Sequence, residues 1–320
     1  MKMSLRGAER RSNLKELSFL RRQESSLFFW IPTFVGKTKN AMPEPALSDK
    51  TRLPRSRWSL AMTRAKGLAM TVLFLFFPTI TFPFMPDTEI ASFQKEIAGK
   101  PVGERIALWA EKFVGTPYDP DPLGEYVTKK VIVADERADC MYLSFRAVEL
   151  AMSLTPEEAV NIALDKRFIN RGKLGNNGKV LNYEDRFQYG EDMLDSGRWG
   201  REITEELGKV TEITGSRGRG KVKMVSKEDL LKSLRSSKSS SSLNLRDGDF
   251  IFFIKAVEKR KVGEIVGHIG IVKIEQRAES REQRAIYLIH AGGVKNKGGE
   301  VKKVRFSEYI NSMPFIGIRV

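Results

Sequence analysis

The hydrophobic pattern changes period along the chain, and this change constrains the fold more than any other feature. Apolar residues recur at helical spacing between residues 87 and 212, as in "CMYLSFRAVELAM", where Met141, Phe145, Val148 and Met152 share one face. The last third instead holds short runs rich in β-branched and aromatic residues: "GDFIFFIKAV", "GHIGIVKIE", "AIYLIHAGG" and "GIRV". Helices first and antiparallel strands last predict an α+β fold.

Local signals place helix starts and loops within this pattern. Asp139 is a predicted N-cap for the helix that begins at Cys140, and Thr155 followed by Pro156 opens a segment predicted to be helical over about residues 155–212. The runs "GSRGRGK" and "SLRSSKSSSSLNL" predict a flexible loop over about residues 215–243. The charged "QRAESREQRA" predicts a hairpin loop between two strands.

The positive charge is concentrated near the N-terminus. The formal net charge is +15, and residues 1–66 hold 15 Lys and Arg against 5 Asp and Glu, whereas the remaining 254 residues hold 40 against 35. The body shows no recognition-helix, zinc-finger or stacking-aromatic pattern. We therefore expect no nucleic-acid partner. A basic nucleic-acid binder is the alternative, and it predicts that deleting residues 1–66 abolishes function.

The N-terminal quarter predicts two segments outside the folded body. Residues 1–61 lack a sustained period and predict an irregular basic arm, disordered or outside the native coding sequence. Residues 62–86 pass from a short basic region into an apolar run, as a secretory signal does. Residues 67–86 carry no charge, and this segment is long enough to span a bilayer, although its three prolines disfavour a continuous helix. We expect an exported protein of the periplasm or cell envelope, with a signal peptide or membrane attachment here and one domain over 87–320.

The chain contains one cysteine, Cys140, and two histidines, His268 and His290. A single cysteine excludes an internal disulfide, and no CxxC or HExxH spacing exists for a zinc site. We therefore expect neither a metal nor a cofactor. Backbone N–H groups and the dipole of a first helical turn lower the pKa of a thiol, yet a lone cysteine on an amphipathic helix is more typical of a small core residue.

The two histidines shift the interpretation of Cys140 towards catalysis. His268 begins one predicted strand and His290 ends the next. Eleven residues lead from His268 to the middle of the hairpin loop, and ten lead from there to His290. The two side chains are therefore expected to face each other. One imidazole that deprotonates the thiol and a second that orients the first make a nucleophile–base–orienter arrangement.

At these residues the chain resembles the NlpC-type papain-fold cell-wall hydrolases. The shared segments occur in the same order: "FVGTPYDPDPLGE", then "ADC" opening a helix, then "LRDGDFIFFI", "GHIGIVKIE" and "IYLIHAGG". The chain is most similar to the N-acetylmuramoyl-L-alanine amidase-like branch, over about residues 104–320. The resemblance implies a papain-like core, with N-terminal helices carrying the cysteine, a helical insertion over about 155–212, and an antiparallel C-terminal sheet carrying both histidines.

The resemblance also implies roles for individual residues. Cys140 is the implied nucleophile, His268 the general base and acid, and His290 the orienting third member. Tyr118 of "GTPY" is implied to lie near the nucleophile and bind the oxyanion; the alternative is a half-buried aromatic in a turn. Asp139 matches an acidic residue that binds a substrate amine in the endopeptidase members, together with a serine after the cysteine.

The residues after Cys140 depart from the endopeptidase pattern. Met141 and Tyr142 stand where those enzymes have Ser or Thr and a small residue. This departure favours an amidase that hydrolyses the N-acetylmuramoyl-L-alanine bond of peptidoglycan fragments (muropeptides) through an acyl-enzyme. The alternatives are a γ-D-glutamyl-diamino-acid endopeptidase of the same fold and a catalytically silent wall-binding module.

Overall fold

The computed structural model describes residues 85–235, 243–261, 263–276, 284–294 and 297–320, which all belong to one compact unit. The expected basic arm, nearly all of the expected signal or anchor segment, and residues 277–283 of the expected hairpin loop lie outside the described residues. Within the described ranges, no helix is both long and apolar enough to span a bilayer.

The first half of the described chain is helical. Its elements are α2 (Asp87–Ile97), α3 (Val102–Lys112), α4 (Glu125–Thr128), α5 (Cys140–Met152), α6 (Pro156–Lys166) and α7 (Gly190–Ser196), with short 3-10 turns η1 (Tyr183–Asp185) and η2 (Thr204–Leu207). The second half holds β1 (Val210–Thr214), β2 (Lys221–Ser226), α8 (Lys227–Arg235), β3 (Phe250–Ile254), η3 (Val257–Lys259), β4 (Val266–Gln276), β5 (Arg284–Val294), β6 (Gly298–Arg305), α9 (Phe306–Ser312) and β7 (Gly317–Arg319).

The strands form one sheet in the order β1-β2-β7-β3-β4-β5-β6, and each neighbouring pair is antiparallel. The α+β prediction is therefore confirmed for the described residues. The four predicted runs became β3, β4, β5 and β7, whereas β1, β2 and β6 were not predicted. In β6, "GGEVKKVR" carries several charged residues because it is an edge strand, and only Val301 of it is fully buried.

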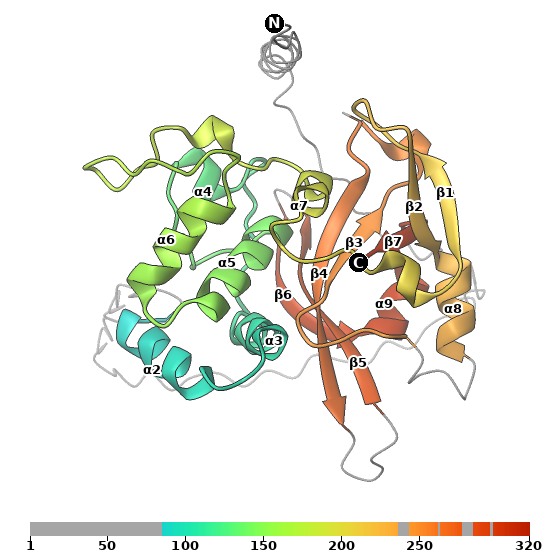
Figure 1. The fold of residues 1–320 in the computed structure, drawn as a ribbon, viewed down its shortest axis with the longest axis horizontal. Helices are drawn as coiled ribbons and strands as arrows, with labels where there is room; N and C mark the ends of the chain where they lie inside the picture. Colours follow the sequence, from blue (N-terminus) through green and yellow to red (C-terminus); the bar gives the residue numbers. More distant parts are fainter. Residues whose placement is uncertain (1–84, 236–242, 262, 277–283, 295–296) are drawn as a thin grey trace, which may run out of the picture. The chain divides into compact units, whose positions relative to one another are not determined.

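The sheet lies between two groups of helices (Figure 1). Helices α3, α5 and α7 pack on one face of the sheet, chiefly against β4, while α8 and α9 cover the other face. Helix α5 is buried on nearly every side, with Met141 and Met152 its least covered residues. It lies between α3, α6 and the sheet, which explains why its sequence is apolar almost all round.

Both predicted helix starts are confirmed. The Asp139 carboxylate accepts a hydrogen bond from the Tyr142 backbone N–H at 2.7 Å, and α5 begins at Cys140. The Thr155 hydroxyl accepts from the Glu158 N–H at 3.2 Å, with Pro156 at the first position of α6.

The prediction of one flexible loop over residues 215–243 is wrong for most of its length. Strand β2 and helix α8 occupy 221–235, whereas 236–242 lie outside the described residues. In β2, Val222 and Met224 alternate with exposed lysines and bury against the core. An alternating pattern of only six residues, between glycine-rich and serine-rich segments, is too short to identify a strand from the sequence. The helical segment predicted over 155–212 consists of α6 followed by only short helical turns, η1, α7 and η2, and it ends within β1.

Candidate active site

Cys140 is the first residue of α5 and is 9% exposed. Its position follows from Asp139, which caps the helix and leaves the thiol in the first turn. Backbone N–H groups in the first turn of a helix stabilise negative charge in general. The Ser144 hydroxyl donates to the Cys140 carbonyl at 2.8 Å, one turn further along. The structure therefore places the predicted nucleophile at the start of α5, directly after the capping Asp139.

Tyr118 is held beside this helix start by backbone hydrogen bonds on both sides. Its N–H donates to the Gly299 carbonyl at 2.8 Å, and the N–H of the next residue, Asp119, donates to the Ala138 carbonyl at 3.1 Å. The first bond ties the loop to the start of β6, and the second ties it to the residues before Cys140. Burial and then the negative charge of Cys140 raise the pKa of Tyr118. The phenol therefore stays protonated near neutral pH.

Two glycines of "HAGG" make room for the site side chains. A Cβ on Gly293 would lie 2.2 Å from the Tyr118 ring, and a Cβ on Gly292 would lie 2.9 Å from the His290 ring. Both contacts are shorter than van der Waals packing allows. The absence of side chains at these positions lets the Tyr118 ring pack directly against β5.

His268 on β4 and His290 on β5 are brought together as predicted. The Nε2 atom of His268 lies 3.0 Å from the Nδ1 atom of His290, and the rings are nearly perpendicular at 88°. Strand β5 pairs with β4 so that Ile289 faces Ile271, and continuing this register by one residue sets His290 opposite Gly270. The two histidines are thus diagonal neighbours on one face of the sheet, close enough for their ring nitrogens to share a proton.

Aromatic rings surround the histidine pair. His268 stacks with Phe253 at a centroid distance of 5.8 Å and with Phe315 at 6.4 Å, and Tyr309 lies 6.2 Å from His268 and 4.7 Å from His290. Burial, followed by the neighbouring His290, lowers the pKa of His268 well below 6.5. Burial, followed by the charge of Lys302, lowers the pKa of His290 to about 4. Both imidazoles are therefore neutral near pH 7.

Tyr309 joins the candidate site, although the sequence did not predict it there. Burial and then the charge of Cys140 raise its pKa, and its ring contacts both histidines. Its sequence context, "FSEYINS", has no motif that marks a site. It reaches the histidines because α9 packs on β5 and β6, a contact that no local pattern predicts.

Two buried ion pairs connect α5 to the loop before it and to the residue after α6. Arg146 binds Asp135 through two nitrogens, with Nε to Oδ1 at 2.9 Å and Nη2 to Oδ2 at 3.0 Å. Arg167 binds Glu149 in the same bidentate way at 2.5 and 2.6 Å. The Tyr142 hydroxyl also donates to Asp135, at 2.6 Å. Because Asp135 lies in the loop that leads to Cys140, the network ties that loop to the helix.

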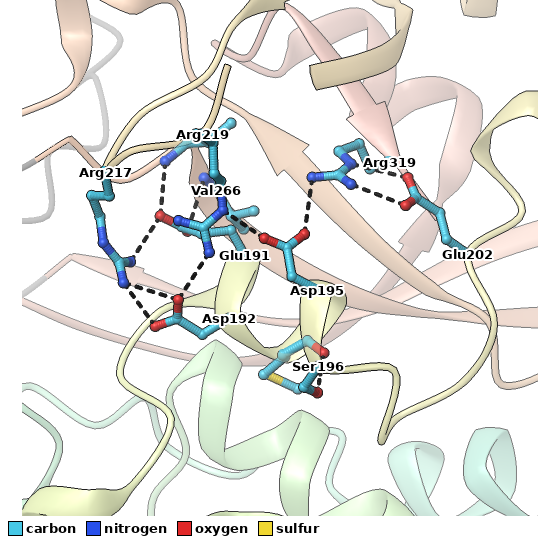
Figure 2. A network of polar contacts seen from close by, with 11 residues as sticks. Glu191, Asp192, Asp195, Ser196, Glu202, Arg217, Arg219, Val266 and Arg319 are labelled. Carbon is cyan, nitrogen blue, oxygen red and sulfur yellow. Dashed lines mark hydrogen bonds and ion pairs between the residues drawn. The ribbon is translucent and has the colours of Figure 1, made fainter. Parts of the chain in front are cut away.

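A second polar network fixes the start of the strand that carries His268. The Glu191 carboxylate on α7 accepts hydrogen bonds from the backbone N–H groups of Ile265 and Val266, at 3.3 and 3.5 Å, and is fully buried. Figure 2 shows that Glu191 and Asp192 of α7 face Arg217, which lies in the turn between β1 and β2. The carboxylates of α7 thus link the start of β4 to the turn between β1 and β2.

Other features of the described residues lie apart from this site. No cluster of three or more His, Cys, Asp or Glu within the described ranges has the arrangement of a metal site. A cavity of about 140 Å³ lies between residues 199–203 and β3. Its lining includes Trp199, Asp249 and Phe252 and none of the predicted site residues.

No protein-family model and no curated protein matches this sequence. Solved structures do match. A Legionella pneumophila protein of the DUF1460 family aligns with a TM-score of 0.53 and 14% identity, over 73% of this chain and 92% of its own. An N-acetylmuramoyl-L-alanine amidase from Bacteroides uniformis aligns with a TM-score of 0.47 and 16% identity, over 68% and 97%. A candidate xylanase from Bacteroides fragilis aligns with a TM-score of 0.46 and 18% identity, over 67% and 98%.

At 14% identity, the match to the Legionella protein shows a shared fold and nothing of the chemistry. The α+β architecture of this chain agrees with that fold. What the site does is therefore argued from its own residues.

Proposed function

We propose that this protein is a cysteine-dependent amidase of the NlpC-type papain fold that hydrolyses the N-acetylmuramoyl-L-alanine bond of muropeptides. One observation carries the proposal: the chain's two histidines form a hydrogen-bonded pair at 3.0 Å, and Tyr309, which packs on both rings, has its pKa raised by burial and by the charge of the sole cysteine. The order and context of these residues resemble that family's site. The choice of bond rests on the resemblance to its amidase-like branch and on Met141 and Tyr142 after the cysteine.

The proposed acylation uses His268 as base and His290 as its orienter. Because its pKa lies near 4, His290 is neutral at pH 7 and its Nδ1 lone pair can accept a hydrogen bond from His268 Nε2–H. This tautomer leaves His268 Nδ1 unprotonated to take the proton of the Cys140 thiol. The thiolate then attacks the lactyl carbonyl carbon of the muramic acid.

The proposed oxyanion site consists of the first-turn N–H groups of α5 and the Tyr118 hydroxyl. A phenol whose pKa is raised remains a hydrogen-bond donor throughout turnover. When the tetrahedral intermediate collapses, His268 gives its proton to the departing alanine nitrogen and a thioester forms. Water, deprotonated by His268, then attacks the thioester carbonyl, and the acid product and the thiol are released.

Mass spectrometry of a disaccharide-tetrapeptide incubated with the full chain tests this function. We expect release of the intact tetrapeptide from the disaccharide. The Cys140→Ser variant should lower the rate by at least about a thousandfold, because a serine hydroxyl is a far poorer nucleophile beside the same base. Met152→Leu, at the far end of the same helix, is the matched control and should retain activity.

Other products would contradict the proposal. A disaccharide-dipeptide would identify a γ-D-glutamyl-diamino-acid endopeptidase instead. Binding of the muropeptide without cleavage, together with a thiol that iodoacetamide does not label at neutral pH, would identify a silent wall-binding module.

A further inference from the structure

Tyr309 has no role in the proposed catalytic steps, yet its ring contacts both histidines of the candidate site. It belongs to α9, which is anchored by Phe306 and Ile310, both fully buried. Helix α9 also packs against α8 and against strands β5 and β6. The Tyr309 ring is therefore carried on a fixed element, because both flanking anchors lie in the core.

The contacts of Tyr309 distinguish it from the other rings of the site. Its centroid lies 4.7 Å from His290 at an interplanar angle of 59°, and 6.2 Å from His268 at 29°. Phe253 and Phe315 stack on His268, and neither has a recorded ring contact with His290 among the described residues. Among the aromatic side chains described, Tyr309 is the one that spans the pair.

The histidine pair needs such a restraint. The terminal torsion of a histidine side chain is broad, so an imidazole without packing rotates readily. The hydrogen bond between His268 and His290 requires two rings at 88° to each other to keep two particular nitrogens in line. A single ring packed on both imidazoles restricts both rotations together.

We propose that Tyr309 is a positioning residue: its ring packs on His268 and His290 and holds them in the tautomer and orientation that serve Cys140. This deepens the proposed function and rests on it for the role of Cys140 as nucleophile. The aromatic ring is what the proposal requires, and the hydroxyl is dispensable for it. Replacing the ring with a branched aliphatic side chain therefore releases the pair, whereas phenylalanine preserves it.

Imidazole NMR on the full chain tests this directly, because the protein contains only two histidines. Long-range ¹H–¹⁵N spectra of histidine-labelled wild type should show each ring in one fixed tautomer, with NOEs from Tyr309 ring protons to both imidazoles. Tyr309→Phe should reproduce these spectra. Tyr309→Leu should show averaged tautomers at both rings.

Iodoacetamide labelling of Cys140 at pH 7 provides a second readout that needs no muropeptide. We expect Tyr309→Leu to slow labelling by about tenfold, since the base is no longer held, and Tyr309→Phe to label within twofold of wild type. Tyr287→Leu is the matched control. Tyr287 lies on the same strand as His290 but contacts Lys303 and Arg305, so its loss should change neither readout.

Three results would overturn the proposal. One is a folded Tyr309→Leu variant that keeps fixed tautomers and the wild-type labelling rate. A second is a Tyr309→Phe variant with averaged tautomers, which would assign the role to the hydroxyl. The third needs no variant: wild-type imidazoles in mixed tautomers, or without NOEs to Tyr309. If these readouts behave as expected but no muropeptide is cleaved, the proposed function fails while the positioning role stands.

Discussion

At the scale of single residues, burial decides the protonation of this site. His290 is only 7% exposed, and the charge of Lys302, its register partner on β6, also disfavours the imidazolium. The proposed mechanism requires a neutral pair, because in it the Nδ1 lone pair of His290 accepts the hydrogen bond from His268 and protonation of His290 would remove that lone pair. The same burial that prepares the base therefore makes the fold sensitive to acid.

The acid sensitivity gives a test at His290. Its pKa is about 4 in the folded protein and 6.5 without perturbation, so below pH 6.5 the unfolded state binds a proton that the folded state does not. The stability contribution is complete above about pH 6.5 and is lost as the pH falls towards 4, with a total of about 3 kcal/mol. His290→Asn, which does not titrate, should lose less free energy of unfolding between pH 7 and 4.5.

Urea unfolding of both proteins at a series of pH values measures this difference. Parallel curves for wild type and His290→Asn would show that His290 titrates normally in the folded state, which contradicts the burial argument.

At the scale of elements, α5 is held by charges that have no access to water. The side chains of Arg146 and Asp135 are 2% and 9% exposed, and those of Arg167 and Glu149 are 2% and 0% exposed. Burying such charges costs several kcal/mol each unless the partner geometry is close to ideal, which the two bidentate pairs provide. These pairs hold α5 to the loop before it and to the residue after α6.

Removing one member of a buried pair leaves an uncompensated charge. We expect Arg146→Met to lower the free energy of unfolding by about 3–5 kcal/mol, because Asp135 keeps the Tyr142 hydroxyl but loses its cation. The double variant Asp135→Leu with Arg146→Met should recover part of this loss. Arg171→Met, from an ion pair whose side chains are both 55% exposed, is the control and should change stability by less than about 1 kcal/mol.

Chemical unfolding curves of the four proteins measure these effects. An Arg146→Met variant as stable as the exposed control would show that the buried pair does not restrain α5.

At the scale of the whole molecule, the polar network of Figure 2 links α7 to the turn between β1 and β2 and to strands β4 and β7. Arg217 and Arg219, from the turn after β1, bind Asp192 on α7, and Arg319 on β7 binds Glu202. Helix α7 packs on β4, the strand that carries His268. The turn between β1 and β2 is therefore connected through α7 to the strand of the candidate base.

Arg217→Met tests this connection. In this variant Glu191 keeps its two backbone hydrogen-bond donors but loses the Arg217 guanidinium, whose side chain is 21% exposed. We expect the free energy of unfolding to fall by about 1–3 kcal/mol at neutral pH. Burial already raises the pKa of Glu191 above 4.5, and losing Arg217 raises it further. A carboxyl group whose pKa is higher in the folded than in the unfolded state lowers the stability of the fold as the pH rises through these pKa values. The difference in stability between wild type and Arg217→Met should therefore shrink below pH 4.5, where Glu191 becomes protonated.

Arg201→Met, from an exposed pair with Glu206, serves as the control and should show little effect at any pH. Thermal unfolding at pH 4 and pH 7 distinguishes the two variants. A loss in Arg217→Met that grows in acid would contradict the assignment of Arg217 as the counter-charge of Glu191.

Much of this protein could be predicted from local signals. The start of α5 depends on Asp139, and the start of α6 depends on Thr155 and Pro156, residues whose effect is exerted within one helical turn. Strands β3, β4 and β5 were visible because they are buried runs of β-branched and aromatic residues. The facing of His268 and His290 followed from hairpin geometry alone.

Only the tertiary structure decided the rest. The edge strand β6 has a mostly exposed sequence, and its pairing with β5 is what makes it a strand. Tyr309 becomes part of the site because α9 packs on a sheet that is assembled from distant segments. The partners of Arg146 and Arg217 are likewise set by packing, since a charge in a sequence does not indicate which opposite charge will be buried beside it. Contacts within a turn or a hairpin are encoded locally, whereas those that complete this site exist only after the sheet has formed.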